Sequence, residues 1–346
     1  MNFSVNQVAP IDFSSTIYSY ASLAGIPIFL IGLIVNLFIL SLFMTDKYFR
    51  KTTYQVMRVT VISDIICTIA SFIGYIQVAS RQLDYYGGTM MCRVSLYFTF
   101  TSYGISMMNL CLIGIDRYYS MKPFSNVYGR NKNRILIFGE VAIAISSASV
   151  TAPVIVFVRV HHNDTLQCDI PEITPSISAY LIAFTIIEFF LPAILIIVIY
   201  WKIIKLQKSY ITPKDAFSVE REEDSLRKKR FIKMLLSISV SYILISWPFF
   251  ASMVGLAITR QSFMDVRMNN IGYFLLLFFS LAVTTSTVIL NPFIYLKFDK
   301  RIRYGSVKLI KRLIPYQCTR QIDINNFNSA ISNSYPLKVE HSIYLR

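Results

Sequence analysis

The stretch GIDRYYSMKPFSN (residues 114–126) ends a long apolar run by placing an acid and a base side by side, Asp116 and Arg117. Cys92 and Arg117 stand 25 residues apart, about 37 Å along a helix and slightly more than the roughly 30 Å core of a lipid bilayer. The pair therefore belongs at a helix end, where the two charges neutralise each other near water. Charge alone leaves two readings open, a plain charged helix end and a functional pair.

The rest of the chain is as apolar as this run. Of 346 residues, 54% are hydrophobic and 15% charged, and the mean hydropathy is +0.52, which indicates a membrane protein. Seven apolar runs are long enough to span a bilayer as helices: Ile17–Met44, Val56–Ala79, Met90–Ile115, Ile135–Val158, Ile177–Tyr200, Met234–Ile258 and Ile271–Leu296. Prolines inside five of these runs predict kinks: Pro27, Pro153, Pro192, Pro248 and Pro292.

The basic residues predict the orientation, because loops rich in Lys and Arg stay in the cytoplasm. With the N-terminus outside, the cytoplasmic segments hold 29 of the 34 Lys and Arg residues, and the outer segments hold no Lys. The two Asn-x-Ser/Thr sequons, at Asn2 and Asn163, then lie outside, where glycosylation takes place. We therefore expect a multi-pass protein of the plasma membrane with an extracellular N-terminus.

The net charge of +15 lies mainly on the expected inner face, so it indicates anionic lipids and cytosolic partners rather than nucleic acid. No internal repeat of about 20 to 50 residues is visible in the sequence, which weighs against many transporter architectures. A transporter or channel remains the alternative from a different functional class.

Along all seven runs, the chain resembles the rhodopsin-like (class A) family of G-protein-coupled receptors. The residues that carry the resemblance stand in order at the family's spacing: Asn36, Asp64, Cys92, Asp116-Arg117-Tyr118, Pro192, Tyr200, Pro248 and NPFIY (residues 291–295), which contains Asn291, Pro292 and Tyr295. The resemblance implies that Arg117 contacts a G protein after activation, while Tyr200 and Tyr295 move inward to hold the opened sixth span.

Departures from the family pattern mark a divergent, orphan-like member. Trp247 directly precedes Pro248, whereas the family's Trp stands two residues before this proline. Because a helix turns by about 100° per residue, the indole should point elsewhere, although we keep both residues among the expected activation residues. In some relatives an acid on the sixth span pairs with the Arg at rest, but LRKKRFIKM (residues 226–234) offers only bases. We therefore expect basal activity.

Two further sites follow from the expected arrangement. Cys92 and Cys168 are the only cysteines on the expected outer side, so an oxidising compartment favours a disulfide between them over two free thiols. Asp64 lies inside an apolar run, and an intramembrane acid is costly. The resemblance implies that Asp64 and Ser106 hold a sodium ion with Asn36 and Asn291 nearby. A protonated Asp64, hydrogen-bonded to these Asn side chains, is the alternative.

Two threonines constrain the ligand through the resemblance. Thr99 occupies the place where amine receptors carry a ligand-pairing Asp, so an ordinary aminergic receptor is not expected. Thr285 occupies the place where visual pigments carry the retinal-binding Lys, so no retinal cofactor is expected, and a light-insensitive opsin relative is an alternative. Both are ligand-pocket candidates.

Glu188 stands one turn before Pro192 and can face the same pocket, where a buried acid attracts a cation. Together with acids in the outer loops, Glu188 favours a peptide or a cationic small molecule as ligand. Tyr103 and Gln77 are further pocket candidates, with helix packing as their alternative role.

Beyond the seventh run, residues 298–315 place apolar side chains on one helical face and bases on the other, which predicts an amphipathic helix along the inner leaflet. Cys318 is a palmitoylation candidate, with a free thiol as the alternative. Residues 316–346 are polar and expected to be disordered, and phosphorylation of serines there would recruit an arrestin.

The sequence thus predicts an all-α membrane protein. Its expected parts are an extracellular N-terminus (residues 1–16), a seven-transmembrane helix bundle (17–297), a short amphipathic cytoplasmic helix (298–315) and a tail (316–346). We expect a receptor rather than an enzyme, which binds an extracellular ligand and activates heterotrimeric G proteins, with an arrestin and membrane lipids as further partners.

Overall fold

The computed structural model describes residues 13–80, 83–121, 126–161, 164–209 and 219–313. Four of the positions discussed above, Asn2, Asn163, Cys318 and the tail beyond residue 315, lie outside these ranges, so their predicted roles stay predictions.

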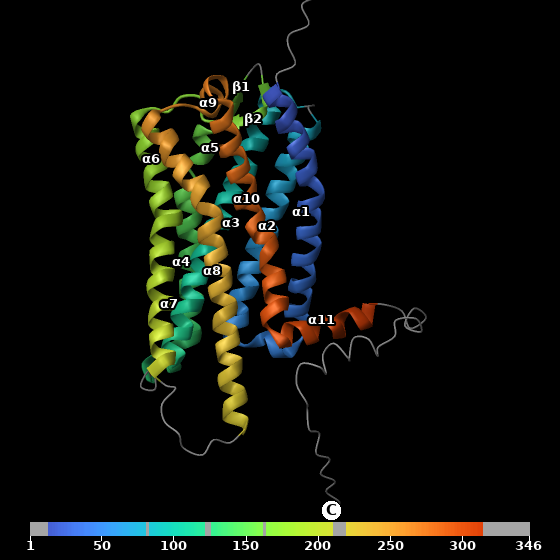
Figure 1. Ribbon diagram of the computed structural model, residues 1–346, viewed down its shortest axis with the longest axis vertical. Coiled ribbons are helices and arrows are strands. Elements are labelled where there is room, and N and C mark those ends of the chain that lie inside the picture. The colour runs from blue at the N-terminus through green and yellow to red at the C-terminus, as the bar shows by residue number, and fades with distance from the viewer. Residues whose placement is uncertain (1–12, 81–82, 122–125, 162–163, 210–218, 314–346) are drawn as a thin grey trace, which may run out of the picture.

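Within the described residues, seven helical segments are long and apolar enough to cross a membrane, and Figure 1 shows them side by side as an upright bundle. They are α1 (Phe13–Thr45), α2 (Thr52–Ser80), α3 (Tyr85–Met121), α4 (Asn126–Thr151) with α5 (Val154–Phe157), α6 (Pro175–Thr185) continuing through η2 (Ile186–Phe190) into α7 (Leu191–Ser209), α8 (Val219–Thr259) and α10 (Ile271–Phe298). The predicted seven-transmembrane bundle is confirmed.

The helices differ in how deeply they are buried. In α3, 72% of the apolar window is buried inside the protein, whereas in the fourth span the share is 17%. The helix α3 is therefore the central element, and it contacts α2, α4, α7 and α8.

The prolines interrupt the helices in different ways. Pro153 stands between α4 and α5, where the helix breaks, and a π-helical turn, η2, precedes Pro192. Pro27, Pro248 and Pro292 lie inside continuous helices, where packed neighbours satisfy the carbonyls that proline leaves without a donor.

One end of the bundle carries a β-hairpin, which the all-α prediction did not include. Strands β1 (Arg159–His161) and β2 (Asp164–Asp169) pair antiparallel beside a short helix, α9 (Phe263–Asn269). The helix α9 begins with a capping box, in which Ser262 and Asp265 each accept the other's backbone N–H. We call this end of the molecule the hairpin end.

The opposite end carries α11 (Lys300–Leu313), which runs across the bundle axis in Figure 1. The Asp299 side chain accepts the backbone N–H groups of Arg301 and Ile302 and so starts the helix. Ile302 is fully buried, and a Cβ at Gly305 would lie 2.8 Å from Leu42 of α1. Glycine at this position thus lets α11 dock on α1. The predicted amphipathic helix is confirmed, and we call this end the α11 end.

Candidate functional site

A hydrogen-bonded cluster joins four helices in the middle of the bundle. Asp64 of α2 is fully buried, and its carboxylate accepts Ser106 Oγ of α3 at 2.9 Å and Asn291 Nδ2 of α10 at 2.7 Å. The hydroxyl of Tyr242 on α8 lies 3.4 Å from Asp64 Oδ1 and accepts Asn291 Nδ2 at 3.0 Å. The cluster therefore links α2, α3, α8 and α10 through side chains alone.

These contacts bring together three of the four residues predicted to hold sodium. Asn36 makes no hydrogen bond to Asp64 among the described contacts, because its amide donates to the backbone carbonyls of Gly32 and Val288. Three protein donors, from Ser106, Tyr242 and Asn291, contact the two oxygens of Asp64. The sodium ion stays a prediction, and no step proposed below depends on it.

Tyr242 was not found by sequence reasoning, although a signal for it exists. Tyr242, Ser246, Phe249 and Phe250 recur at helical spacing, and all four are at most 1% exposed. Trp247 falls between these positions and is 55% exposed. The predicted displacement of the indole is confirmed, because it lies on the exposed face of α8, and its place among the activation residues stays a prediction.

A second cluster lies at the α11 end around the Asp116-Arg117 pair. Asp116 is 1% exposed, and its carboxylate lies 3.0 Å from Arg117 Nη2 and 2.6 Å from Lys132 Nζ of α4. It also accepts the hydroxyls of Thr53 on α2 and Tyr128 on α4, at 3.2 and 2.8 Å. The pair does neutralise itself as predicted, but its buried half also holds α2, α3 and α4 together.

Arg117 is held from a second direction by the sixth span. Its guanidinium donates to the Thr53 hydroxyl and lies 4.8 Å from the ring centroid of Phe231 on α8. A cation over an aromatic face is attracted by the ring quadrupole. The sequence offers only bases, and no acid, on this part of α8, and the contact with Arg117 is made by the aromatic ring of Phe231 instead.

The other predicted coupling residues lie near this cluster or along the helices that lead to it. Tyr200 of α7 and Tyr295 of α10 are each 2% exposed. A Cβ at Gly114 would lie 3.8 Å from the Tyr200 ring, so Tyr200 packs against α3. The Tyr295 ring lies 6.5 Å from that of Phe43 on α1. Pro292 is buried within α10, and Tyr118 is partly buried beside Arg117.

A cavity of about 160 Å³ opens toward the hairpin end. Thr99 and Thr285, both predicted pocket residues, are part of its lining, and residues 167–170, at the end of the hairpin, line it as well. Two predictions are thus supported by the position of the side chains.

The other three predicted pocket residues lie outside this lining, and their contact with a ligand stays a prediction. Gln77 donates to the backbone carbonyl of Gly88 and ties α2 to α3. The Tyr103 ring packs 5.4 Å from Phe250. Glu188 is 3% exposed within η2 and sits against Gly104 of α3, where an added Cβ would overlap Glu188 Oε2. Gln77 and the ring of Tyr103 thus make contacts between helices, whereas Glu188 Oε2 is buried without a hydrogen-bond partner among the described residues.

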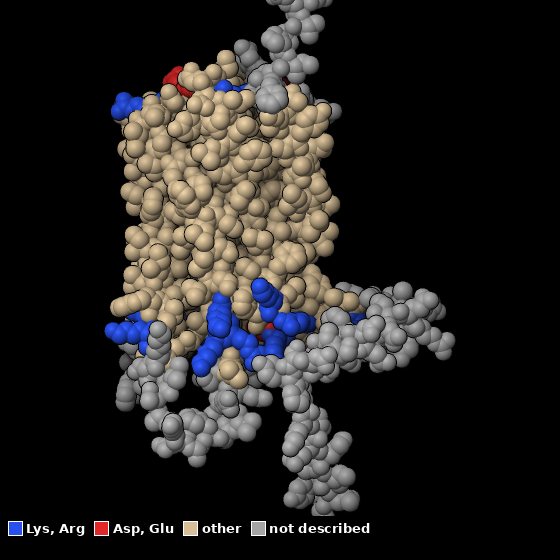
Figure 2. Space-filling model, in the orientation of Figure 1, with Lys and Arg blue, Asp and Glu red and all other residues tan. Residues whose placement is uncertain are grey.

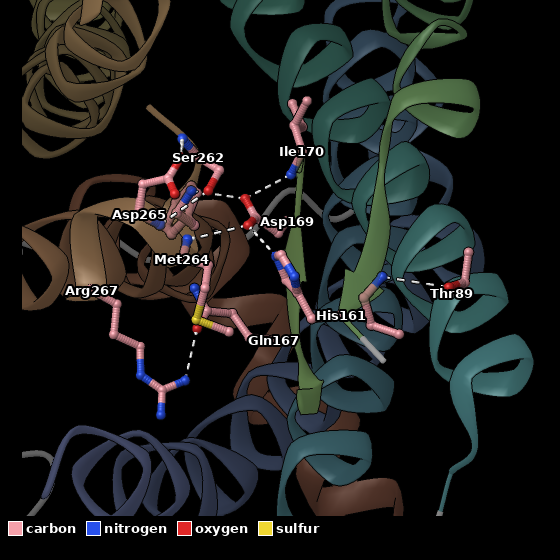
Figure 3. A network of polar contacts seen from close by, with 11 residues as sticks. Thr89, His161, Gln167, Asp169, Ile170, Ser262, Met264, Asp265 and Arg267 are labelled. Carbon is pink, nitrogen blue, oxygen red and sulfur yellow. Dashed lines mark hydrogen bonds and ion pairs between the residues drawn. The ribbon is translucent and has the colours of Figure 1, made fainter. Parts of the chain in front are cut away.

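The disulfide Cys92–Cys168 is present, with Cα atoms 5.5 Å apart, and fixes β2 to α3. The next residue, Asp169, fixes the same hairpin to α9, as Figure 3 shows. Its carboxylate accepts the backbone N–H groups of Ile170, Phe263 and Met264 at 2.7, 2.8 and 3.2 Å and lies 2.8 Å from His161 Nε2. We call this group the hairpin latch.

Three of the acids that were predicted to attract a cationic ligand, Asp169, Asp265 and Asp84, make hydrogen bonds within the loops at the hairpin end. Asp169 and Asp265 accept backbone N–H groups of the loops themselves, and Asp84 accepts the N–H of Gly87 at the start of α3. These three carboxylates therefore stabilise the loops at the hairpin end, although Asp84 remains exposed to solvent.

Substituting Asp169 by Asn is expected to loosen α9, because an amide presents fewer acceptors to the same N–H groups. Hydrogen bonds to charged groups contribute about 1.5–3 kcal/mol each, so loss of about 2 kcal/mol would speed amide exchange at Phe263 and Met264 roughly thirtyfold. Hydrogen exchange with mass spectrometry measures this. Glu172→Gln, at an exposed position in the same loop, is the matched control, and equal exchange in both variants would contradict the latch.

Comparison with known proteins adds to this geometry. The family model described as "7 transmembrane receptor (rhodopsin family)" matches residues 35–295, a range that contains both polar clusters and the cavity. The chain superimposes on the crystal structure of squid rhodopsin with a TM-score of 0.69 and 15% sequence identity, covering 94% of this chain and 93% of that one. At this identity the likeness concerns the fold.

Relatives with curated names agree in class and are distant in sequence. The chain is 24% identical over 293 residues to "G-protein coupled receptor homolog K2" of Swinepox virus, covering 80% of this chain and 73% of that protein. Melanopsin-A of Danio rerio is 23% identical over 241 residues, 66% of this chain. The octopamine receptor beta-1R of Drosophila melanogaster is 24% identical over 347 residues, 86% of this chain. The matches cover 39% and 64% of the lengths of these last two.

Proposed function

The chain belongs to the rhodopsin family of seven-transmembrane receptors, and from this premise we propose that it binds an extracellular ligand at the hairpin end and promotes nucleotide exchange on a heterotrimeric G protein at the α11 end. This requires the N-terminus to lie outside the cell. The distribution of charge supports that orientation, because Lys and Arg gather at the α11 end in Figure 2, as cytoplasmic segments do.

The observation that carries the proposal is the position of Arg117. It combines a fixed charge, partial exposure of 26%, and contact with the sixth span through Phe231. A movement of α8 away from α3 would separate Phe231 from Arg117 and expose the guanidinium to a cytosolic partner. The resting arrangement has the contact between Phe231 and Arg117, and the arrangement with α8 displaced lacks it. A ligand that moves α8 and a partner that binds Arg117 would therefore act on the same equilibrium, which is what a coupled switch requires.

The cluster around Asp64 supplies the connection between the two ends. Tyr242 lies on α8 and touches residues of α2 and α10, so a displacement of α8 must change its hydrogen bonds. Ser246, one turn closer to the cavity on the same face, is fully buried. We propose that a ligand in the cavity shifts α8 at Phe249 and that Tyr242 transmits the shift toward Phe231.

The proposal predicts how Phe231 affects activity without ligand. Its contact with Arg117 is worth about 1 kcal/mol at a partly exposed site, so Phe231→Leu is expected to raise agonist-free exchange roughly fivefold. The measurement is binding of a non-hydrolysable GTP analogue to purified G proteins mixed with the receptor in lipid vesicles.

The matched control is Phe231→Tyr, which keeps the aromatic face over Arg117 and should leave the agonist-free rate near that of the wild type. A panel of G-protein subtypes is needed, since the subtype is not fixed by the contacts described here. Unchanged rates in the Leu variant would refute the resting contact, and no receptor-dependent exchange with any subtype would refute the proposed function. Binding of an arrestin to the receptor is a further expectation of the same family role.

A further inference from the structure

The cavity under the hairpin has two chemically different walls. The wall formed by α5, α6 and α8 is apolar, with lining residues Val154, Leu181, Phe184, Phe249, Met253 and Leu256. The rings of Phe184 and Phe249 lie 5.4 and 5.8 Å from that of Phe100 on α3 and continue this surface. Tyr180 also lines the wall, but its hydroxyl donates to the carbonyl of Val150.

The other wall consists of α1, α2, α3 and α10, and besides apolar and aromatic side chains these helices supply Ser and Thr hydroxyl groups, which the first wall lacks: Ser22, Ser71, Ser95, Thr99 and Thr285. Three of these hydroxyls donate their protons to backbone carbonyls. Ser22 donates to Tyr18, Ser95 donates to Ala70, and Thr285 donates to Ala282. Because a hydroxyl that donates in this way keeps its lone pairs, these oxygens are acceptors for a donor in the cavity.

Charged side chains are scarce along the cavity lining. Among the described residues that line the cavity, Asp169 is the only one with a charged side chain. Its carboxylate already meets three backbone N–H groups and His161, which is about the full capacity of a carboxylate. Glu188 lies outside the lining, against Gly104. An ammonium or carboxylate group of a ligand would therefore be buried without a counter-charge, which costs several kcal/mol.

We infer that this cavity binds an uncharged, largely apolar molecule that carries a hydroxyl or N–H donor at one end, rather than a cationic or peptide ligand. The inference rests on the receptor function proposed above and specifies the ligand class for that function. The apolar body packs against the rings of α6 and α8, and the donor end meets the hydroxyl oxygens of α1, α3 and α10.

A matched pair of photoprobes tests the inference. Both carry a diazirine on the same aryl-alkyl skeleton, and one ends in a primary alcohol, the other in a primary ammonium. The full-length receptor in lipid nanodiscs, without a G protein, is labelled with each probe and digested, and labelled peptides are mapped by mass spectrometry. We expect the alcohol to label the hairpin-end halves of α3 and α8 at least tenfold more than the ammonium does.

Substitutions separate the cavity from the lipid. Met253→Trp fills the cavity and should remove the labelling by the alcohol, whereas Leu244→Trp, at a 63% exposed position of the same helix, should not. Thr285→Val keeps the shape and removes an acceptor, so it should weaken labelling several-fold. Ser286→Ala, on a residue outside the lining, is the control for that change.

Two outcomes would overturn the inference. One is labelling of the cavity peptides by the ammonium probe at least as strong as by the alcohol. The other is labelling that survives both Met253→Trp and Thr285→Val in receptor whose melting temperature matches the wild type. These outcomes differ from a failure of the proposed receptor function. If the protein did not act on a G protein, nucleotide exchange would be absent while the labelling pattern stayed as expected.

Discussion

Replacing Arg117 by Ala is expected to reduce receptor-dependent nucleotide exchange to the rate of the G protein alone. The guanidinium contacts α8 through Phe231, so its loss removes both the resting contact and the charge offered to the partner. The measurement is binding of a GTP analogue to the G protein in vesicles. Arg117→Ala is introduced into the Phe231→Leu variant, whose agonist-free rate is raised, so that the loss of exchange can be measured without a ligand.

Two controls accompany this variant. Arg130→Ala removes the same charge from an exposed position on α4 at the same end of the molecule, and exchange should persist. Arg117→Lys keeps the charge and loses the planar group that lies over the Phe231 ring and donates to Thr53, and an intermediate rate is expected. If Arg117→Ala retains full exchange, or if the protein shows ion flux that survives this substitution, a receptor mechanism through Arg117 is wrong.

Removing the disulfide is expected to produce the largest loss of stability. The bridge closes a segment with a sequence separation of 76 residues, for which chain entropy alone gives about 4.5 kcal/mol. Helices that persist in the unfolded membrane state reduce this figure, so we expect about 2 kcal/mol and a melting temperature lower by several degrees for Cys92→Ser. Thermal unfolding in detergent measures it.

The same change should disturb the hairpin more than the helices, because Cys168 precedes the latch residue Asp169 directly. Cys111→Ser is the matched control, since Cys111 is a buried free cysteine of α3 that contacts only carbonyl oxygens in its hydrogen bonds. Reduction of the wild type should reproduce the effect of Cys92→Ser and leave the melting temperature of Cys92→Ser itself unchanged. Equal stability of the two variants would show that the bridge contributes little.

The helical part of the fold could be read from the sequence because bilayer thickness imposes one length on every span. Run length and the placement of bases sufficed to find the seven spans and the amphipathic helix, and the position of Trp247 next to Pro248 sufficed to predict that its indole leaves the interior. The β-hairpin could not be found in this way, because its two short strands depend on pairing with each other and on the Cys92–Cys168 bridge.

Site residues were predicted where a family motif or an expensive buried charge marked them, as at Asp64, Asp116 and Arg117. Their partners were missed because Tyr242, Phe231 and Thr53 are ordinary apolar or hydroxyl residues whose role depends on which helix faces which. Glu188 is the opposite case, because it was predicted as a pocket residue and lies outside the cavity lining. Its spacing from Pro192 suggested a pocket residue, but the absence of a side chain at Gly104 gives the carboxylate room beside α3, outside the cavity lining.

The length of α8 has a mechanical consequence. Helices bend most readily at proline, and Pro248 stands 29 residues from the Val219 end of this 41-residue helix, an arm of about 43 Å. A pivot of about 10° at the proline would swing that tip through roughly 7.5 Å, whereas Phe249, beside the fulcrum, would move by less than about 1 Å. A helix of these proportions works as a lever, so a displacement smaller than a bond length beside the proline becomes a shift of most of a helix diameter at the far tip.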